Sequence, residues 1–450
     1  MKFLGDMMYG IMASGTTVLS EIVRSFAPDG KQRSVENRLS FNLERKGLAD
    51  EIHAVIAEDA KRFINRKTLI IIDPTEVCKP HAYRMEFISR VRDASKSTQD
   101  NPALVNGYHG CMAIACKSGS RKTIPLALRL WSTNAKGHIG ENDEVLKTLK
   151  AIDEATNGIG IRVYDRGGDR KTFYDHFLDH GHDFIVRIKE RTLSGWRGLH
   201  EAEWLAQQCV MKHRQIVNYD SHGRETKCTI DFGVVPVLLP WRDEPLRLVV
   251  VKGYGHKPMM LLTNLAGTAR GDADDSYAAL WQVVEGYLSR WRIEETIRFV
   301  KQSYGFEKIR VMAYEKWKNM AAIVLATAYF TAAWLGHDVK KEAMVDHLEH
   351  MHQRLNEVPE FFLYALAAGL KRAFTRYGRW APKIEETKNF APMLPGWDEM
   401  MYTGAGKNRC TLTTTKSEPS LRKSDGVFVP ALFRGRRAGR RAYKPQTARA

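Results

Sequence analysis

The chain has 450 residues, of which 44% are hydrophobic, so it is long enough for two to four domains with a sizeable buried core. Its 69 Lys and Arg residues against 52 Asp and Glu residues give a formal charge of +17, which favours a polyanionic partner over a small neutral substrate. Six scattered cysteines without Cys-x-x-Cys pairs argue against a zinc ribbon or a disulfide scaffold, and the sequence predicts neither a signal peptide nor a membrane span.

The first sixty residues read as helical and basic. VLSEIVRSF (18–26) and SVENRLSFNLER (34–45) are amphipathic segments on either side of a Pro-Asp-Gly break. Two short helices around a turn fit a DNA-reading helix-turn-helix, and they fit a plain helical cap on a larger domain equally well. We interpret residues 1–60 as an N-terminal helical DNA-binding region.

Residues 61–190 alternate strand and helix signals. Three strands joined by hairpin-like connections come first, and a helix, a strand, a helix and a further strand follow. The expected elements are TLIIID (68–73), GCMAIACK (110–117), IPLALRLW (124–131), a helix over 141–155, a strand ending at Asp165, a helix over 172–180 and DFIVRIK (183–189). This order predicts an α/β fold, with a mixed sheet flanked by helices, and is compatible with a ribonuclease H-like core.

Residues 191–264 predict a β-rich antiparallel insertion, because four apolar runs in it are separated by turn-forming residues. Helical character returns in residues 265–340, which are expected to hold the second part of the core. Within them, the uncharged run 320–336 is too short to cross a bilayer and predicts a buried helix. We expect a C-terminal helical region over 341–432 and a basic disordered tail over 433–450.

The stretch YLSRWRIEETIRFVK (287–301) predicts a helix that carries both charges on one face. Tyr287, Arg290, Glu294 and Lys301 lie within roughly 60° of one another at about 100° per residue, so they form one stripe about 21 Å long. Taken alone, such a stripe is more often a solvated face with ion pairs four residues apart.

Two further carboxylates end apolar strand-like runs. Asp73 ends TLIIID and Asp165 ends GIRVYD, although either one alone is more often a turn former or a helix cap. If the two strands are neighbours, the carboxylates converge at a sheet edge, and a helix packed across the sheet can add Glu294. Three such oxygen ligands suit Mg²⁺, and two ions about 4 Å apart serve phosphodiester chemistry. Asp169, four residues beyond the strand, is a poorer ligand candidate than Asp165.

These residues make the chain resemble the DDE transposases of bacterial insertion sequences that cut DNA through a hairpin intermediate. Their signature, Tyr-x2-Arg-x3-Glu-x6-Lys, fits Tyr287, Arg290, Glu294 and Lys301 without a gap. The run RWRIEE and an Asp-Arg element followed by a strand like FIVRIK are also typical of the group. The resemblance covers residues 65–310 well and implies a ribonuclease H-like core with a β-rich insertion.

The resemblance also implies a role for each matched residue. Two Mg²⁺ ions, which Mn²⁺ can replace, are expected on the catalytic carboxylates Asp73, Asp165 and Glu294. The expected contacts to the DNA end and its hairpin are Tyr287, Arg290, Lys301, Arg298 and Met259. Some relatives have a Trp at the position of Met259 that stacks on a flipped base, and a thioether packs on a base less well than an indole.

We therefore expect a DNA transposase that binds the terminal inverted repeats of its mobile element, excises the element through a hairpin and joins it to target DNA. The expected partners are double-stranded DNA and a second copy of the chain in a synaptic complex, with no membrane and no small-molecule substrate. The expected location is the bacterial cytoplasm, at the nucleoid when DNA is bound. Two alternatives are a domesticated DNA-binding regulator and a metal-dependent DNA endonuclease without strand transfer.

Overall fold

A computed structural model describes most of the chain up to residue 377. The described residues are 2–27, 29–94, 96–98, 101–195, 197–221, 224–265, 275–336 and 363–377. All of them belong to one compact unit, Met1–Thr403. Most of the expected C-terminal helical region and all of the expected basic tail lie outside the described residues.

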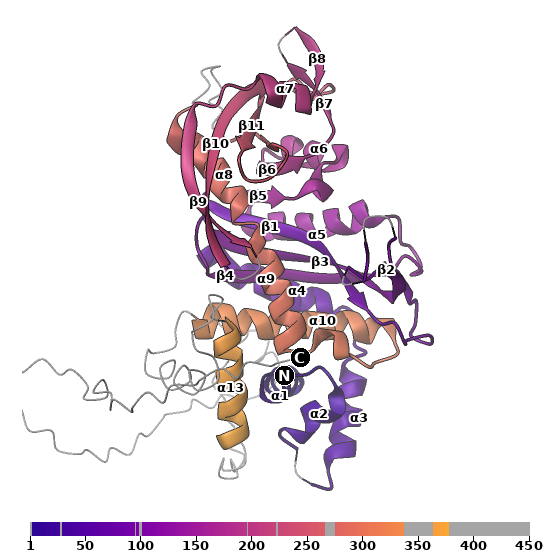
Figure 1. Ribbon diagram of the computed structural model, residues 1–450. Helices are drawn as coiled ribbons and strands as arrows, with labels where there is room; N and C mark the ends of the chain where they lie inside the picture. The colour runs from indigo at the N-terminus through magenta and orange to yellow at the C-terminus, as the bar shows by residue number, and fades with distance from the viewer. Residues whose placement is uncertain are drawn as a thin grey trace, which may run out of the picture. The chain divides into compact units, whose positions relative to one another are not determined.

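The described chain is built on a 10-stranded mixed sheet (Figure 1). Its strands are β1 (Thr68–Cys78), β2 (Ser89–Arg92), β3 (Leu104–Lys117), β4 (Thr123–Trp131), β5 (Ile161–Tyr164), β6 (Asp183–Ile188), β9 (His213–Ser221), β10 (Arg224–Val237), β11 (Leu246–Lys252) and β12 (Met259–Thr263). They lie in the order β2-β3-β1-β5-β6-β12-β11-β10-β9, with β4 paired to β3 off this path. A separate hairpin joins β7 (Thr192–Gly195) to β8 (Gly198–Glu201).

The centre of the sheet confirms the predicted order of antiparallel and parallel strands. β3 is antiparallel to both β1 and β4, whereas β1, β5 and β6 run parallel to one another. The first five residues of β1 are all buried, as expected of a strand covered on both faces. The result is a large mixed sheet flanked by helices, which is the α/β architecture that the sequence predicts.

The prediction that the first strand ends at Asp73 is wrong. Asp73 lies opposite Met112 in β3, and the pairing of the two strands continues to Cys78. The apolar run ends earlier because most of the later residues of β1 are only half-buried, so polar side chains are tolerated there. The end of the apolar run therefore shows where the strand becomes less buried. It does not show where the backbone pairing with β3 ends.

The predicted insertion is antiparallel, and it continues the core sheet. Strands β9 to β12 pair with their sequence neighbours in antiparallel fashion, and β12 pairs with β6 of the core. Between the β7–β8 hairpin and β9 lies the short helix α7 (Ala202–Gln208). Backbone hydrogen bonds thus join the insertion directly to a core strand.

Helices cover the sheet and form the N-terminal region (Figure 1). The α-helices besides α7 are α1 (Lys2–Ser14), α2 (Leu19–Arg24), α3 (Gln32–Asn42), α4 (Leu48–Ala60), α5 (Glu141–Thr156), α6 (Lys171–Asp179), α8 (Tyr277–Leu288), α9 (Trp291–Ser303), α10 (Tyr314–Tyr329) and α13 (Leu363–Tyr377). Short helical turns are η1 (Lys61–Phe63), η2 (Arg166–Gly168), η3 (Phe306–Lys308) and the π-helical η4 (Phe330–Leu335). Helix α9 contacts β1, β3 and β4, and α8 contacts β5, β6 and the insertion strands β10 to β12.

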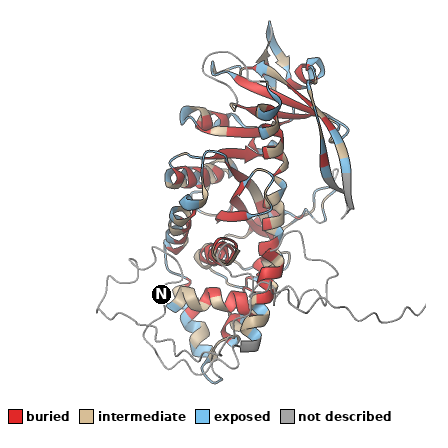
Figure 2. Cartoon of the chain, turned by 90° about the vertical axis from the view of Figure 1, so that its left-hand side faces the viewer, coloured by how far each residue is buried: buried red, intermediate tan, exposed pale blue. Residues whose placement is uncertain are grey.

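The core follows the strands and the helices packed on them (Figure 2). The buried helix predicted over residues 320–336 is found as α10 and η4, and nearly all of α10 from Trp317 onward is buried. None of the helices in the described ranges combines the length and apolar character needed to span a membrane.

Asn319 on α10 holds the turn between α3 and α4. Its side chain is fully buried, accepts a hydrogen bond from Ala49 N at 2.9 Å, and donates to the carbonyls of Leu43 and Arg45 at 2.9 and 2.8 Å. Helix α4 begins after Gly47, which cannot cap it with a side chain, so the amide of Asn319 satisfies one of its free N–H groups from outside.

We predict that Asn319→Ala lowers the free energy of unfolding by about 2–4 kcal/mol, because it leaves buried backbone groups without partners. Urea denaturation followed by tryptophan fluorescence measures the change. The matched control is Asn37→Ala on the exposed face of α3, which should change stability by less than about 0.5 kcal/mol. Equal effects of the two substitutions would contradict the role given to Asn319.

Candidate active site

The register of two central strands brings Asp73 and Asp165 to the same end of the sheet. β1 and β5 pair in parallel, and Ile71 lies opposite Val163. Asp73 and Asp165 each follow two residues later, so the register puts them level with each other, Asp73 within β1 and Asp165 just after β5. This confirms the expectation that the two strands are neighbours.

The backbone after β5 is shaped by a glycine. Asp165 is extended, with φ −81° and ψ −172°, and immediately precedes η2. Gly168 in that turn lies against the ring of Tyr164, because a Cβ there would be 2.4 Å from the Cγ of the tyrosine. The Gly-rich run after Asp165 therefore packs the turn onto a buried aromatic ring and lets the carboxylate project from the strand end.

The stretch that carries Glu294 is not one continuous helix, so the predicted straight stripe is wrong. The break lies between α8 and α9, where Ser289 Oγ donates to Glu285 O at 2.8 Å and accepts from Gly119 N at 3.0 Å. Such serine bonds to the backbone bend helices. Tyr287 therefore lies on α8, and the other residues of the signature lie at or after the start of α9.

Arg290 lies among the three carboxylates. Its Nη2 donates to Glu294 Oε1 at 2.6 Å, and its Nη1 lies 3.8 Å from Asp73 Oδ2. Its positive charge also acts on Asp165. The guanidinium side chain is 13% exposed, whereas those of the carboxylates are 24% to 35% exposed. Arg290 thus neutralises an acidic site that solvent can reach.

Asp165 has a second set of partners. Tyr287 donates its hydroxyl hydrogen to Asp165 Oδ1 at 2.8 Å, and Arg187 Nη1 donates to the tyrosine oxygen at 3.3 Å. Burial raises the pKa of Asp165, but the charge of Arg290 and the hydrogen bond from Tyr287 outweigh it and hold the pKa below its ordinary value. Asp165 is therefore ionised at neutral pH.

The pKa of Asp73 is shifted in the opposite direction. Burial, together with the nearby charges of Glu294 and Asp165, raises the pKa of Asp73 to about 7 against the opposing effect of Arg290. Two neighbouring carboxylates with different pKa values are typical of functional sites, because negative charge is concentrated there beyond what the protein neutralises.

The remaining candidates differ in where they lie. Lys301 Nζ donates to Glu76 O at 2.7 Å and pairs with Glu307 Oε1 at 3.0 Å, so it lies near the same strand as Asp73. Arg298 is exposed on α9. Met259 opens β12 opposite Val251 and is 3% exposed. The side chain is part of the core, so its predicted contact with a base stays a prediction that requires Met259 to become accessible.

Two residues near Asp165 bear on which side chains belong to the candidate active site. Asp169 forms an ion pair with Arg191 and accepts from Tyr174 OH at 3.1 Å, so its carboxylate is already used. Arg187, on β6, contacts Tyr287 and is missing from the predicted site. The sequence indicates Arg187 only by placing a charged residue inside the apolar strand DFIVRIK. Its side chain is half-buried, whereas its two neighbours in the strand are buried.

The three carboxylates do not meet at one point. In the described ranges, only one group of three or more His, Cys, Asp or Glu side chains has all its ligand atoms within 4.8 Å of one another. That group lies elsewhere, on α5, on α6 and just before β6. Asp73, Asp165 and Glu294 instead surround a guanidinium. Their oxygens are the hard donors that divalent ions such as Mg²⁺ prefer, and their partial exposure leaves them accessible.

The family of the chain follows from a comparison with known protein families. Residues 64–330, more than half of the chain, match the transposase DDE domain family. The chain belongs to this family. A DDE transposase is a DNA-cleaving and DNA-joining enzyme that uses divalent metal ions. The match is to the broad family and does not single out its hairpin-forming group.

Other comparisons add little to the family match. No curated protein matches the chain. Among solved structures, a piggyBac transposase synaptic complex with hairpin DNA is similar at 12% identity and a TM-score of 0.36, over 85% of this chain and 73% of that chain.

We predict that the DDE transposase without metal loses stability as pH rises, because of Asp73. Its pKa is about 7 in the folded state, above the value of 3.8 for an isolated aspartate, so its contribution is fully present below about pH 4 and is lost as pH rises through 7. Relative to Asp73→Asn, the free energy of unfolding of the unmutated protein should fall by about 2–3 kcal/mol between pH 5 and pH 8.

Urea denaturation in EDTA at the two pH values measures this difference. Asp50→Asn serves as the control, because the Asp50 side chain is 72% exposed. Its pH dependence should match that of the unmutated protein. Parallel pH dependences of the unmutated protein and Asp73→Asn would show that the pKa of Asp73 is not raised.

Proposed function

We propose that the chain is the transposase of its own mobile element, which binds the terminal inverted repeats, excises the element and joins it to target DNA. The observation that carries the proposal is the gathering of Asp73, Asp165 and Glu294 around Arg290 in a chain of the DDE transposase family. The strand order β4-β3-β1-β5-β6 supports a ribonuclease H-like core, and the charge of +17 suits a DNA partner.

Asp73, Asp165 and Glu294 would hold the divalent ions, preferably Mg²⁺, with Mn²⁺ as a substitute. Two such ions would supply activation of the attacking oxygen and stabilisation of the leaving one. The raised pKa of Asp73 supports this assignment, because burial and the neighbouring carboxylates disfavour its ionised form and a bound cation would relieve both effects. With ions on the carboxylates, Arg290 is no longer needed to balance their charge, and its guanidinium is free to hold a DNA phosphate.

The residues around the carboxylates position the DNA. Tyr287 orients Asp165 through its hydroxyl group, and Arg187 holds the tyrosine from the other side. On α9, Arg298 is exposed and Lys301 lies near the strand of Asp73, and we assign both to contacts with DNA phosphates. A synaptic complex of two copies is expected, because both element ends must be joined to one target.

The chemistry is two kinds of attack on phosphorus. Water attacks a phosphodiester at the element end, which releases a 3′ hydroxyl and a 5′ phosphate. The 3′ hydroxyl then attacks the opposite strand, so that one phosphodiester replaces another and a hairpin closes. After water reopens the hairpin, the same hydroxyl attacks target DNA. No covalent bond between protein and DNA is needed.

A different aromatic side chain is better placed than Met259 to stack on an extruded base. Trp291 directly follows Arg290 and is 51% exposed, whereas Met259 is 3% exposed. Base stacking needs an accessible aromatic face. We therefore assign the stacking role to Trp291.

We predict that Asp165→Asn and Glu294→Gln each lower cleavage of a labelled element end in Mg²⁺ by about 1,000-fold or more while leaving binding of that end intact. The loss follows from removing a charged oxygen ligand. The matched control is Glu295→Gln, a neighbour that pairs with Arg292 at 2.7 Å, and its cleavage rate should stay within about threefold. Gel analysis of cleaved and joined products measures each step.

The same assay separates the alternatives. Binding of the element end without cleavage by the unmutated protein would favour the DNA-binding regulator. Nicking without hairpin or joined product would leave a metal-dependent endonuclease. Cleavage that survives in Asp165→Asn would overturn the assignment of the catalytic carboxylates.

We also predict that Trp291→Ala lowers hairpin formation by about 5- to 100-fold and leaves first-strand nicking unchanged, because it removes one stacking contact. The ratio of hairpin to nicked product measures the effect. Trp204→Ala is the control, since Trp204 is 42% exposed on α7 and is not part of the site. An equal loss of nicking and hairpin in Trp291→Ala would exclude the stacking role.

A further inference from the structure

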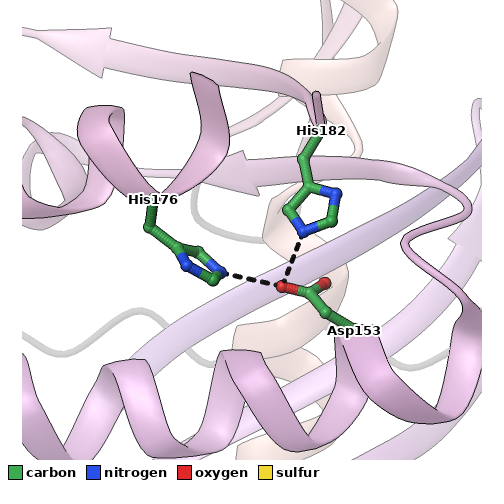
Figure 3. Close-up of side chains that lie close together, drawn as sticks. All are labelled: Asp153, His176 and His182. Atoms are coloured by element: carbon green, nitrogen blue, oxygen red, sulfur yellow. Dashed lines mark hydrogen bonds and ion pairs between the residues drawn. The ribbon is translucent and has the colours of Figure 1, made fainter. Parts of the chain in front are cut away.

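A buried cluster outside the catalytic site joins three parts of the core (Figure 3). Asp153 lies on α5, His176 lies on α6, and His182 lies just before β6. The three residues are 6% to 8% exposed, and their ligand atoms all lie within 4.8 Å of one another. Both imidazole rings direct Nε2 toward the same oxygen, Asp153 Oδ2 (Figure 3).

One nitrogen of the cluster lacks a hydrogen-bond partner. His176 Nε2 lies 2.9 Å from Asp153 Oδ2 and is hydrogen-bonded to it. His182 Nε2 lies 3.1 Å from the same oxygen, but it has neither the geometry of a hydrogen bond nor another hydrogen-bond partner in the described part of the chain. Buried polar nitrogens are nearly always paired in folded proteins. This nitrogen is therefore available as a ligand for a bound ion.

The donor spacing suits a small transition-metal ion. Zn–N and Zn–O bonds are about 2 Å long, so the donors of one tetrahedral site lie roughly 3.3 Å apart. The observed separations from Asp153 Oδ2 are 2.9 Å to His176 and 3.1 Å to His182, so small shifts would admit an ion. Two imidazoles and one carboxylate form a donor set typical of Zn²⁺ and Co²⁺, and unlike the all-oxygen set of the catalytic site.

The surroundings hold the donors in the state that an ion needs. The guanidinium of Arg162 binds the Asp153 carboxylate directly, and this contact favours its ionised form. Arg162 is fully buried and binds Asp153 through Oδ1, which leaves Oδ2 for the cluster. Metal-binding carboxylates commonly have such outer partners.

A third histidine borders the cluster. His180 Nδ1 donates to His176 O at 2.8 Å, which leaves its Nε2 without a proton in the neutral ring. Its ring stacks on that of His182, with centroids 5.6 Å apart and planes at 17°. His180 is exposed, so it lies where a fourth donor could come from the solvent side.

We propose that Asp153, His176 and His182 form a structural site for one Zn²⁺-class ion, separate from the catalytic carboxylates. The ion would connect α5, α6 and the start of β6 around β5, the strand that ends beside Asp165. Because the positive charge of Arg162 lies close by and opposes a second cation, the affinity is expected to be micromolar rather than as tight as that of a zinc finger.

The test uses the full-length chain with Asp165→Asn, so that the catalytic site does not contribute. The sequence HLEHMH contains other histidines, so the same protein also carries His347→Gln and His350→Gln. CoCl₂ and ZnCl₂ are titrated in turn. We expect one Co²⁺ per chain, visible absorption bands of a low-symmetry Co²⁺ site, displacement by Zn²⁺ but not by excess Mg²⁺, and a higher Tm with Zn²⁺.

Substitutions locate the site. His182→Gln should weaken binding of Co²⁺ at least 100-fold, and His180→Gln should weaken it by less than about tenfold. The control His81→Gln changes an exposed histidine and should leave binding unchanged. Circular dichroism without metal checks that each variant is folded.

Two outcomes would overturn the proposal. One is the absence of a saturable Co²⁺ signal below about 100 μM in the protein with intact Asp153, His176 and His182, which does not depend on the folding of any cluster variant. The other is unchanged Co²⁺ affinity in a folded His182→Gln variant. Either result would identify the cluster as a buried hydrogen-bonded ion pair alone, and neither bears on the transposase activity.

Discussion

Strands β1 and β5 run parallel at the centre of the sheet, and the other parts of the site are placed relative to that pair. Their register puts Asp73 and Asp165 level with each other. Parallel neighbours need a long connection, and here it includes α5, the helix that carries Asp153. The buried ion pair between Asp153 and Arg162 fixes this helix to β5 three residues before Asp165. The edge that carries the proposed catalytic carboxylates is therefore held by a charge contact as well as by the hydrogen bonds between the strands.

Arg290 explains how three carboxylates coexist without an ion. One guanidinium cannot balance three negative charges, and the pKa of Asp73 is raised by its burial and, to a smaller extent, by the charges of Glu294 and Asp165. Stability is thus reduced at neutral pH by a group whose ionised form the proposed function needs. Binding sites commonly contain an unfavourable arrangement of charges that lowers stability until a ligand of opposite charge binds. Divalent ions would both stabilise the protein and free Arg290 for DNA.

The sequence predicted the features of the fold and the site that depend on local residue patterns. It missed those that depend on contacts between residues far apart in the chain. Apolar runs located β1 and β5, and the spacing around Glu294 identified the family, as the match over residues 64–330 confirms. The break before α9 was not predictable from spacing, because Ser289 is bonded to Gly119, 170 residues away. Likewise, nothing in the pattern of MMLLT distinguishes a buried strand from one with an accessible Met259, since burial there is set by β11 and the core.

Strand β6 joins three features that the sequence presents as separate. It pairs with β12 of the insertion, carries Arg187 against Tyr287, and begins directly after His182 of the buried cluster. Arg187 lies opposite Leu261 of β12, so a displacement of the insertion strand would be passed through one side chain to the tyrosine that orients Asp165. Strand β6 therefore connects the insertion to the edge of the sheet that carries the proposed catalytic carboxylates. The proposed ion on His182 would hold the start of the same strand, which begins at the next residue.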